Sequence, residues 1–168
     1  MGAALINDIS AGKLDDTMLN PVADLHVPYI MMHMRCTPQT MQKQTVYSNL
    51  IKDILFYFSE RIAAARQLGI VDMIIDPGFG FAKTLEQNFE LLNQLELFKM
   101  LELPLLVGVS RKSMIYKTLQ NSASEALNGT TVLNTIALQK GANILRVHDV
   151  KEAIETIKLV QSLNPKIA

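Results

Sequence analysis

The sequence predicts an α/β fold whose sheet is parallel and covered by helices. Five short apolar runs recur along the chain, and segments with the apolar spacing of amphipathic helices separate them. Runs that are almost continuously apolar are typical of strands buried on both faces, as in a parallel sheet. Each run also ends in polar residues, and parallel α/β sheets carry their functional residues at the carboxyl ends of their strands. The pattern therefore indicates an enzyme.

The bulk composition indicates a single globular domain. The chain has 168 residues, of which 49% are hydrophobic and 19% are charged, enough to bury a core. Its 16 basic and 16 acidic residues give no net charge, so no nucleic-acid partner is expected. The single cysteine, Cys36, permits no internal disulfide and favours a reducing, cytoplasmic environment. No apolar stretch approaches the roughly 20 residues of a membrane helix, so no membrane partner is expected.

The apolar runs define the expected strands, and the spacing between them defines the helices. With their polar ends the runs are Leu5–Asp8, Tyr29–His33, Met73–Asp76, Leu105–Lys112 and Ile144–Asp149. Helices are predicted over about 14–25, 47–68, 84–98, 112–119 and 124–139, with a last helix after residue 149. Thr84 with Gln87, and Asp149 with Glu152, are expected to cap the helices that follow them. The expected buried stripe of the last helix is Val150, Ala153, Ile154, Ile157 and Val160.

These elements form five βα units in succession. Because crossover connections are right-handed, the strands should be parallel, either in a barrel or in an open sheet. An eight-unit barrel usually takes about 250 residues, so this chain falls short of one by about three units. If the fold is that barrel, the chain is expected to be its later part.

Asp76 ends the third run and opens the segment Asp76–Phe81, which reads DPGFGF. The two glycines allow backbone to approach a ligand closely, and the carboxylate can accept paired N–H donors from a flat heterocycle. The alternative is an ordinary turn in which Asp76 bonds nearby backbone N–H groups. A phosphate-binding P-loop is excluded, because Ala82 and not glycine precedes Lys83.

Two cationic segments follow the later strands. Two cations stand at the start of a helix in the segment Ser110-Arg111-Lys112-Ser113. This position is unfavourable for a cation because the helix dipole is already positive there, so a bound anion or electron-rich ring would explain the placement. The alternative is a solvated turn. Because side chains alternate along a strand, Arg146 and His148 are expected on the same side of the last strand. A guanidinium beside an imidazole suits a phosphate or diphosphate. Arg146 could instead pair with a carboxylate inside a barrel.

Other residues at the strand ends give weaker indications. Asn7 can both donate and accept, which suits the edge of a heterocycle, but Asn-Asp is also ordinary turn sequence. Met32 belongs to a methionine-rich run of the kind that more often fills a core than lines a ligand site. His33 is expected to be structural, and the three histidines lack the spacing of a metal site.

Together these segments resemble the dihydropteroate synthases of the folate pathway. The matching segments, in order, are INDIS at 6–10, MHMR at 32–35 with Thr37-Pro38 and Thr40-Met41-Gln42, DPGFGF at 76–81, VGVSRKS at 107–113 and RVHDV at 146–150. Their order and spacing are kept over essentially the whole chain, which makes the match specific. The family fold is a (β/α)8 TIM barrel, so the resemblance implies a partial (β/α)8 barrel with about strands 4 to 8 and their helices.

The resemblance also implies a reaction and a role for each matching residue. The family condenses 6-hydroxymethyl-7,8-dihydropterin diphosphate with 4-aminobenzoate, giving 7,8-dihydropteroate and diphosphate. By resemblance, the residues that would bind the pterin are Asn7, Met32, Asp76, Phe81, Gly108 and Lys112. Ser110 and Arg111 would contact the aminobenzoate, where sulfonamides compete, and Arg146 and His148 would contact the diphosphate. The catalytic residues would be Asp76, Lys112, Arg146 and His148.

Parts of the family pattern have no counterpart in these 168 residues. The family uses Mg2+, bound with the help of an Asn on a first strand that this sequence does not contain. Residues 1–168 are therefore expected to form one pterin-binding domain that lacks about three βα units at its amino end and is inactive alone. A complete barrel would form a homodimer. Cys36, Ala82 and Tyr116 stand where the family commonly has glycine, so the loops there should differ in shape.

Two alternatives remain open. A related pterin-binding barrel transfers a methyl group from methyltetrahydrofolate and would share Asn7 and Asp76. It needs no diphosphate site, so the segments Ser110-Arg111-Lys112 and Arg146-Val147-His148 argue against it. The other alternative is a non-catalytic, truncated fragment that acts only with a partner supplying the remaining strands.

Overall fold

The computed structural model of this chain describes residues 4–35 and 45–163. Its elements, in chain order, are β1 (Ile6–Asp8), α1 (Leu19–Leu25), β2 (Tyr29–Met32), α2 (Leu50–Gln67), β3 (Met73–Asp76), α3 (Leu85–Asn93), the 3-10 helix η2 (Leu95–Leu101), β4 (Leu106–Val107), α4 (Ser113–Leu119), the 3-10 helix η3 (Ala123–Glu125), α5 (Leu127–Gln139), β5 (Ile144–Leu145) and α6 (Val150–Leu163). Cys36, Thr37-Pro38 and Thr40-Met41-Gln42 lie outside the described residues. No described helix is long and apolar enough to cross a membrane.

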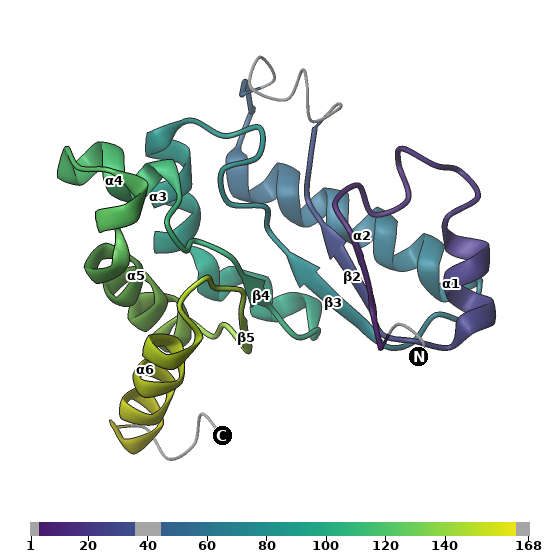
Figure 1. The fold of residues 1–168 in the computed structure, drawn as a ribbon. Coiled ribbons are helices and arrows are strands. Elements are labelled where there is room, and N and C mark those ends of the chain that lie inside the picture. Colours follow the sequence, from purple (N-terminus) through teal and green to yellow (C-terminus); the bar gives the residue numbers. More distant parts are fainter. Residues whose placement is uncertain (1–3, 36–44, 164–168) are drawn as a thin grey trace.

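The described strands lie side by side in the order of the chain. β1, β2 and β3 form one parallel sheet, and β4 pairs in parallel with β5. A parallel bridge between Ile75 and Leu105 connects the two groups, so the order is β1-β2-β3-β4-β5 without a reversal. A doubly wound open sheet reverses its strand order at a switch point, whereas a barrel adds each strand next to the last. The topology is therefore that of a barrel segment (Figure 1).

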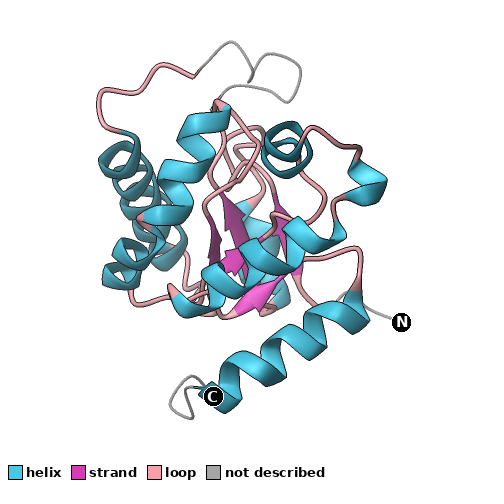
Figure 2. Cartoon of the chain, turned by 90° about the vertical axis from the view of Figure 1, so that its left-hand side faces the viewer, coloured by secondary structure: helices cyan, strands magenta, loops and turns pink. Residues whose placement is uncertain are grey.

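Alternation along the strands separates two apolar layers. Residues such as Tyr29, Met31 and Ile75 point towards the helices and belong to the main core. Their neighbours Ile30, Ile74 and Leu106 form a second, small buried cluster on the opposite face of the strands. Seen from the side, the strands lie in the middle with helices around them (Figure 2). The main core thus lies between the strands and the helices, as the near-continuous apolar runs predict.

Helix α2 shows how the sequence fixes one of these helices against the strands. Asn49 is its N-cap, and its side chain accepts a hydrogen bond from the backbone N–H of Lys52 at 3.0 Å. Gly69 lies just beyond the other end with φ of 81°, a left-handed conformation that suits glycine. The face between them is apolar, and its Phe58 is fully buried. Burial of one such side chain contributes about 1.5–3 kcal/mol to folding.

Three details of the helices differ from the sequence prediction. The first helix begins at Leu19 and not near residue 14, because Asp15 accepts hydrogen bonds from the backbone N–H and hydroxyl of Thr17 and holds a turn there. The third predicted helix divides after Asn93, and η2 follows it. The helix predicted over 124–139 is likewise split into η3 and α5.

The last helix is rotated relative to the predicted stripe. Its buried residues are Ala153, Thr156 and Val160, whereas Val150 and Ile154 are exposed. The predicted box of Thr84 and Gln87 at α3 is confirmed, with both reciprocal hydrogen bonds present. Asp149 was predicted to cap α6 together with Glu152. In the structure both of its carboxylate oxygens accept hydrogen bonds from Arg111.

Candidate active site

The carboxyl ends of the strands bring polar side chains from distant parts of the sequence onto one face. The register pairs Met32 with Asp76, so these two residues lie side by side at the ends of β2 and β3. Both stand two residues beyond the small cluster of Ile30, Ile74 and Leu106 and therefore point to the same face as that cluster. The same alternation places Gly108 and Arg146 two residues beyond the paired Leu106 and Ile144.

Asp76 is the acidic residue at the centre of this face. The residue is 1% exposed, and its Oδ1 accepts a hydrogen bond from the backbone N–H of Gly78 at 2.8 Å. Its Oδ2 is buried and has no hydrogen-bond partner among the residues that the structure describes. Burial raises the pKa of the Asp76 carboxyl, while the Gly78 N–H and the cations of Arg146, Lys112 and Lys83 act in the opposite direction. Oδ2 of Asp76 is therefore a hydrogen-bond acceptor that is buried from solvent and available to a ligand.

Two cations border this carboxylate. Nη2 of Arg146 lies 3.8 Å from Oδ2 of Asp76, close enough for an ion pair but too far for a hydrogen bond. The Lys112 ammonium donates to the carbonyl oxygen of Phe79 and lies 4.8 Å from the centre of the Phe81 ring. Burial lowers the pKa of Lys112 to about 8, although Asp76 opposes that shift. The face thus combines one buried acceptor with two nearby positive charges.

The absence of a side chain at Gly108 leaves room for the guanidinium of Arg146. A Cβ on Gly108 would lie 3.1 Å from Nε and Nη2 of Arg146, closer than most real contacts. The guanidinium therefore packs directly on the backbone of the neighbouring strand end.

A second pair of contacts joins the segments after β4 and β5. Oγ of Ser110 lies 3.0 Å from Nδ1 of His148 and accepts the backbone N–H of His148 at 3.2 Å. Arg111 donates to both carboxylate oxygens of Asp149, at 2.9 and 2.8 Å, and to the carbonyl oxygens of Ala123 and Ser124. These interactions hold the two loops together and fix the position of His148 beside the strand end.

The remaining predicted site residues lie around the same face. Met32 is buried, and Phe81 is half-buried beside Lys112. Asn7 is exposed and pairs with Ile30, two strands away from Asp76 and nearer the amino end of the strands. The structure therefore brings Asp76, Lys112 and Arg146 together, sets Ser110 and His148 beside each other, and leaves Asn7 farther away. The substrate roles assigned to these residues remain predictions.

Sequence reasoning missed one buried cation, Lys83. It is 8% exposed, and its Nζ lies 3.1 Å from Nδ1 of His33. His33 itself is 1% exposed, in keeping with the structural role predicted for it. Periodicity could not identify this pair, because the two residues lie in loops after different strands. The only indication of Lys83 in the sequence was its place two residues after the DPGFGF segment.

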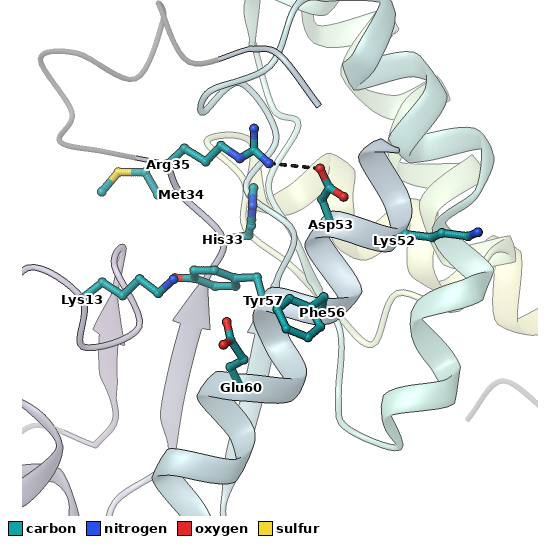
Figure 3. A pocket seen from close by; sticks show the side chains of 9 residues that line it. All are labelled: Lys13, His33, Met34, Arg35, Lys52, Asp53, Phe56, Tyr57 and Glu60. Carbon is teal, nitrogen blue, oxygen red and sulfur yellow. Dashed lines mark hydrogen bonds and ion pairs between the residues drawn. The ribbon is translucent and has the colours of Figure 1, made fainter. Parts of the chain in front are cut away.

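A cavity of about 580 Å³ lies on another side of His33 (Figure 3). The residues that line it are Lys13, His33, Met34, Arg35, Lys52, Asp53, Phe56, Tyr57 and Glu60. The carboxylate of Asp53 pairs with Arg35 at 3.1 Å, and the Lys13 ammonium lies 4.5 Å from the centre of the Tyr57 ring. Lys13 and His33 come from the loops after β1 and β2, and none of Asp76, Lys112 and Arg146 lines this cavity.

With this arrangement known, the comparisons with other proteins decide the family. Residues 1–148 match the family described as pterin binding enzymes. The chain belongs to the pterin binding enzyme family. Among its relatives, the dihydropteroate synthase of Escherichia coli is 42% identical over 164 residues, which are 96% of this chain and 58% of that protein. The chain thus spans little more than half the length of this relative.

Solved structures of pterin binding enzymes extend the comparison to the fold. The Yersinia pestis dihydropteroate synthase in complex with a sulfonamide drug superposes with a TM-score of 0.94 at 38% identity, covering 98% of this chain and 60% of that one. The Xanthomonas albilineans enzyme with 4-aminobenzoic acid gives a TM-score of 0.88 at 35% identity, covering 96% and 58%. The predicted resemblance to dihydropteroate synthases and the predicted partial (β/α)8 barrel are both confirmed.

Proposed function

We propose that this chain carries the pterin and diphosphate sites of a dihydropteroate synthase. The observation that carries the proposal is the buried Oδ2 of Asp76, which has no hydrogen bond from any described residue and lies near the cations of Arg146 and Lys112. A buried acceptor without a partner is costly, and a ligand with N–H donors removes that cost. The amino group and ring N–H of a pterin are such donors on a flat edge. The description of the family as pterin binding enzymes names a ligand class that this chemistry suits.

The difference in exposure between Asp76 and Arg146 gives the orientation of the substrate. The Asp76 side chain is 2% exposed, whereas that of Arg146 is 41% exposed. A ligand that reaches Asp76 with its ring therefore leaves its substituent near Arg146, at the mouth of the site. Arg146 with His148 would hold the diphosphate there, because a guanidinium fork matches phosphate oxygens.

The proposed reaction is a substitution at the methylene carbon of the pterin. The carbon–oxygen bond breaks, and its electron pair leaves with the diphosphate. The amine of 4-aminobenzoate forms the new carbon–nitrogen bond with its lone pair and then loses a proton. Asp76 would stabilise the positive charge that develops on the pterin, and Arg146 would stabilise the leaving anion. Lys112 would orient the ring through its position above Phe81.

Ser110 and Arg111 contact other residues of the chain at the ends of β4 and β5. Their contacts in this structure are with His148 and Asp149, which makes them supports for the diphosphate end of the site. Contact of either residue with 4-aminobenzoate remains a prediction of the resemblance. The bound 4-aminobenzoic acid of the Xanthomonas albilineans enzyme supports the substrate class and not these two residues.

The described ranges, 4–35 and 45–163, contain no group of three or more His, Cys, Asp or Glu side chains that could hold a metal ion. We assign no step of the reaction to Mg2+. The homodimer, the cytoplasmic location and the single incomplete domain belong to this proposal as predictions of the sequence.

The test is a chimera of the Escherichia coli relative in which this chain replaces the matched 164 residues. We expect the chimera to release diphosphate only when 4-aminobenzoate is present. That dependence also excludes a methyltransferase, which needs no diphosphate. The 168-residue chain alone, measured beside it, tests the alternative of a non-catalytic fragment. A folded chimera that neither binds pterin nor releases diphosphate would refute the proposed function.

A further inference from the structure

Lys83 lies directly behind the turn that carries Asp76. Its Nζ donates to the carbonyl oxygens of Gly78 at 2.9 Å and Phe81 at 3.1 Å, and it lies 3.1 Å from Nδ1 of His33. An ammonium has three donors and no acceptor, so these three groups satisfy it completely. His33 must then accept at Nδ1, which places its own ring proton on Nε2. Lys83 thus closes the turn from behind and ties it to the end of β2.

The same turn supplies the contacts of two residues in the proposed site. The backbone N–H of Gly78 donates to Asp76, and the carbonyl oxygen of Phe79 accepts from Lys112. The backbone N–H of Phe81 donates a hydrogen bond to the carbonyl oxygen of Gly78 at 3.1 Å, which closes the turn over residues 78–81. Any loosening of the turn would therefore disturb Asp76 and Lys112 together.

Lys83 and Asp76 are coupled by their charges as well as by the hydrogen bonds of the turn. The cation of Lys83 favours the ionised form of Asp76, and the Asp76 carboxylate favours the ionised form of Lys83. Burial has the opposite effect on the lysine and lowers the pKa of Lys83 to about 7. The charge on Lys83 therefore changes near neutral pH, where the proposed site must bind its substrate.

We infer that Lys83 is a positioning residue of this site: clamped by Gly78, Phe81 and His33, it holds the turn in place and keeps Asp76 ionised. The inference rests on the proposed function only in giving Asp76 a pterin to bind. Lys83 acts through Asp76 and does not touch the substrate.

Other charged groups face the same residues and limit the effect of Lys83. Asp76 also faces Arg146 after β5 and Lys112 after β4, so loss of Lys83 leaves two cations beside it. Lys83 in turn faces Lys112 and Arg35, which favour its neutral form. Removal of Lys83 should therefore raise the pKa of Asp76 without making it behave as an isolated buried acid.

His33 is the part of this clamp that can be altered separately. Its ring faces Arg35 and Lys13 as well as Lys83, and burial together with these charges lowers the pKa of His33. The ring therefore stays neutral and remains an acceptor for Lys83. Figure 3 shows His33 between Arg35 and Tyr57, with its ring at the wall of the cavity of about 580 Å³.

The experiment compares Lys83→Met with the unaltered chain by carbon-13 NMR of the aspartate carboxyls. We expect the titration of Asp76 to move to higher pH in the variant, which a purely structural role of Lys83 would not cause. The amide of Phe81 should exchange with solvent about fivefold to thirtyfold faster, as loss of one or two hydrogen bonds predicts. Lys52→Met removes an equal charge from an exposed position on α2 and should change neither measurement.

A second pair of variants covers the case in which Lys83→Met fails to fold. His33→Asn and His33→Leu remove the same ring, but asparagine keeps an acceptor where Nδ1 stood. The variant His33→Asn is expected to leave the Asp76 titration near its original place, whereas His33→Leu should shift it upward. Equal titration curves in these two variants, or in Lys83→Met and the unaltered chain, would overturn the inference.

The outcome is independent of the proposed function. The carboxyl titration reports the coupling of Lys83 and Asp76 whether or not a pterin binds. Calorimetry with 6-hydroxymethylpterin on the same samples reports the proposed function. A shifted Asp76 titration without pterin binding would support the coupling of Lys83 to Asp76 and refute the proposed function. Pterin binding with an unshifted titration would support the proposed function and refute the coupling.

Discussion

Nη2 of Arg146 lies 3.8 Å from Oδ2 of Asp76, so the two residues form an ion pair without a hydrogen bond. The guanidinium balances the charge of the buried carboxylate, but Oδ2 accepts no hydrogen bond within the part of the chain that the structure describes. A hydrogen-bonded pair would be more stable by itself and less able to receive a ligand, because the ligand would have to displace the arginine. The separation of these two groups therefore prepares the site for an N–H donor.

Asp76→Asn should weaken pterin binding and stabilise the fold. The amide places a donor where the carboxylate acceptor stood, so we expect affinity for 6-hydroxymethylpterin to fall about 100-fold or more. Burial raises the pKa of Asp76, so the ionised side chain costs stability that a neutral amide does not. Each 1 kcal/mol gained should raise the Tm by about 2–4 °C. Calorimetric titration and thermal unfolding measure the two effects.

The sign of that second effect follows from proton linkage. The folded state holds the proton of Asp76 more strongly than the unfolded state, because its folded pKa is raised. The stability that this gives is present at low pH and is lost as the pH rises through the folded pKa. Asp76→Asn should remove this loss. A variant that melts below the unaltered chain at neutral pH would contradict the account of Asp76 as a strained buried acid.

Arg146→Ala should weaken binding of the diphosphate-bearing pterin more than binding of the free pterin. The guanidinium is exposed enough to meet an anion at the mouth, whereas the ring site lies deeper, at Asp76. Loss of a charge-assisted contact of this kind costs about 2–5 kcal/mol, so the diphosphate ligand should lose at least about 30-fold in affinity. Calorimetry with each ligand measures the difference.

Arg66→Ala supplies the control for that experiment. Arg66 lies in the last turn of α2, which precedes β3 and is therefore at the opposite end of the strands from the site. Neither ligand should distinguish this variant from the unaltered chain. If Arg146→Ala reduced both affinities by the same factor, the assignment of Arg146 to the diphosphate would be wrong.

The strand ends could be predicted from the sequence because parallel strands have a simple geometry. Asp76, Arg146 and Lys112 are far apart in the chain, yet each follows an apolar run, and the carboxyl ends of parallel strands meet at one edge. That rule needs no knowledge of loop shape. It correctly anticipated that Asp76 and Arg146 would meet.

The loops could not be predicted in the same way, because a few backbone angles decide their contacts. Ala82 adopts φ of 51°, a left-handed conformation that is unusual for alanine, next to the buried Lys83. No periodic pattern reports such an angle, so the clamp of Lys83 and His33 was missed. The pairing of Ser110 with His148 was missed for the same reason, although both residues were individually expected in the site.

Lys112 should give pterin binding a dependence on alkaline pH. Burial lowers the pKa of Lys112 to about 8, so above that pH the ammonium becomes a neutral amine. Affinity for the pterin should decrease as the pH rises through about 8, and Lys112→Met should lower the affinity and remove this decrease. Because the folded pKa lies below the unfolded value of 10.5, the unaltered chain should also gain stability between these two values. Urea unfolding over this range tests the second effect, and a pH-independent affinity would argue against Lys112 as a ligand-binding residue.

Gly78→Ala should destabilise the chain more than Gly69→Ala, although both glycines have left-handed backbone angles. Gly78 has φ of 73° and Gly69 has φ of 81°. A Cβ on Gly78 would overlap the carbonyl oxygen of His33, whereas a Cβ on Gly69 would have nothing within 4 Å. The Gly69 variant should therefore lose only about 1–2 kcal/mol for its backbone conformation. The Gly78 variant should lose about 1–3 kcal/mol more for overpacking and should also bind pterin more weakly, because Gly78 donates to Asp76. Urea unfolding of both variants decides the matter, and equal losses of stability would show that the turn does not pack against the end of β2 as described.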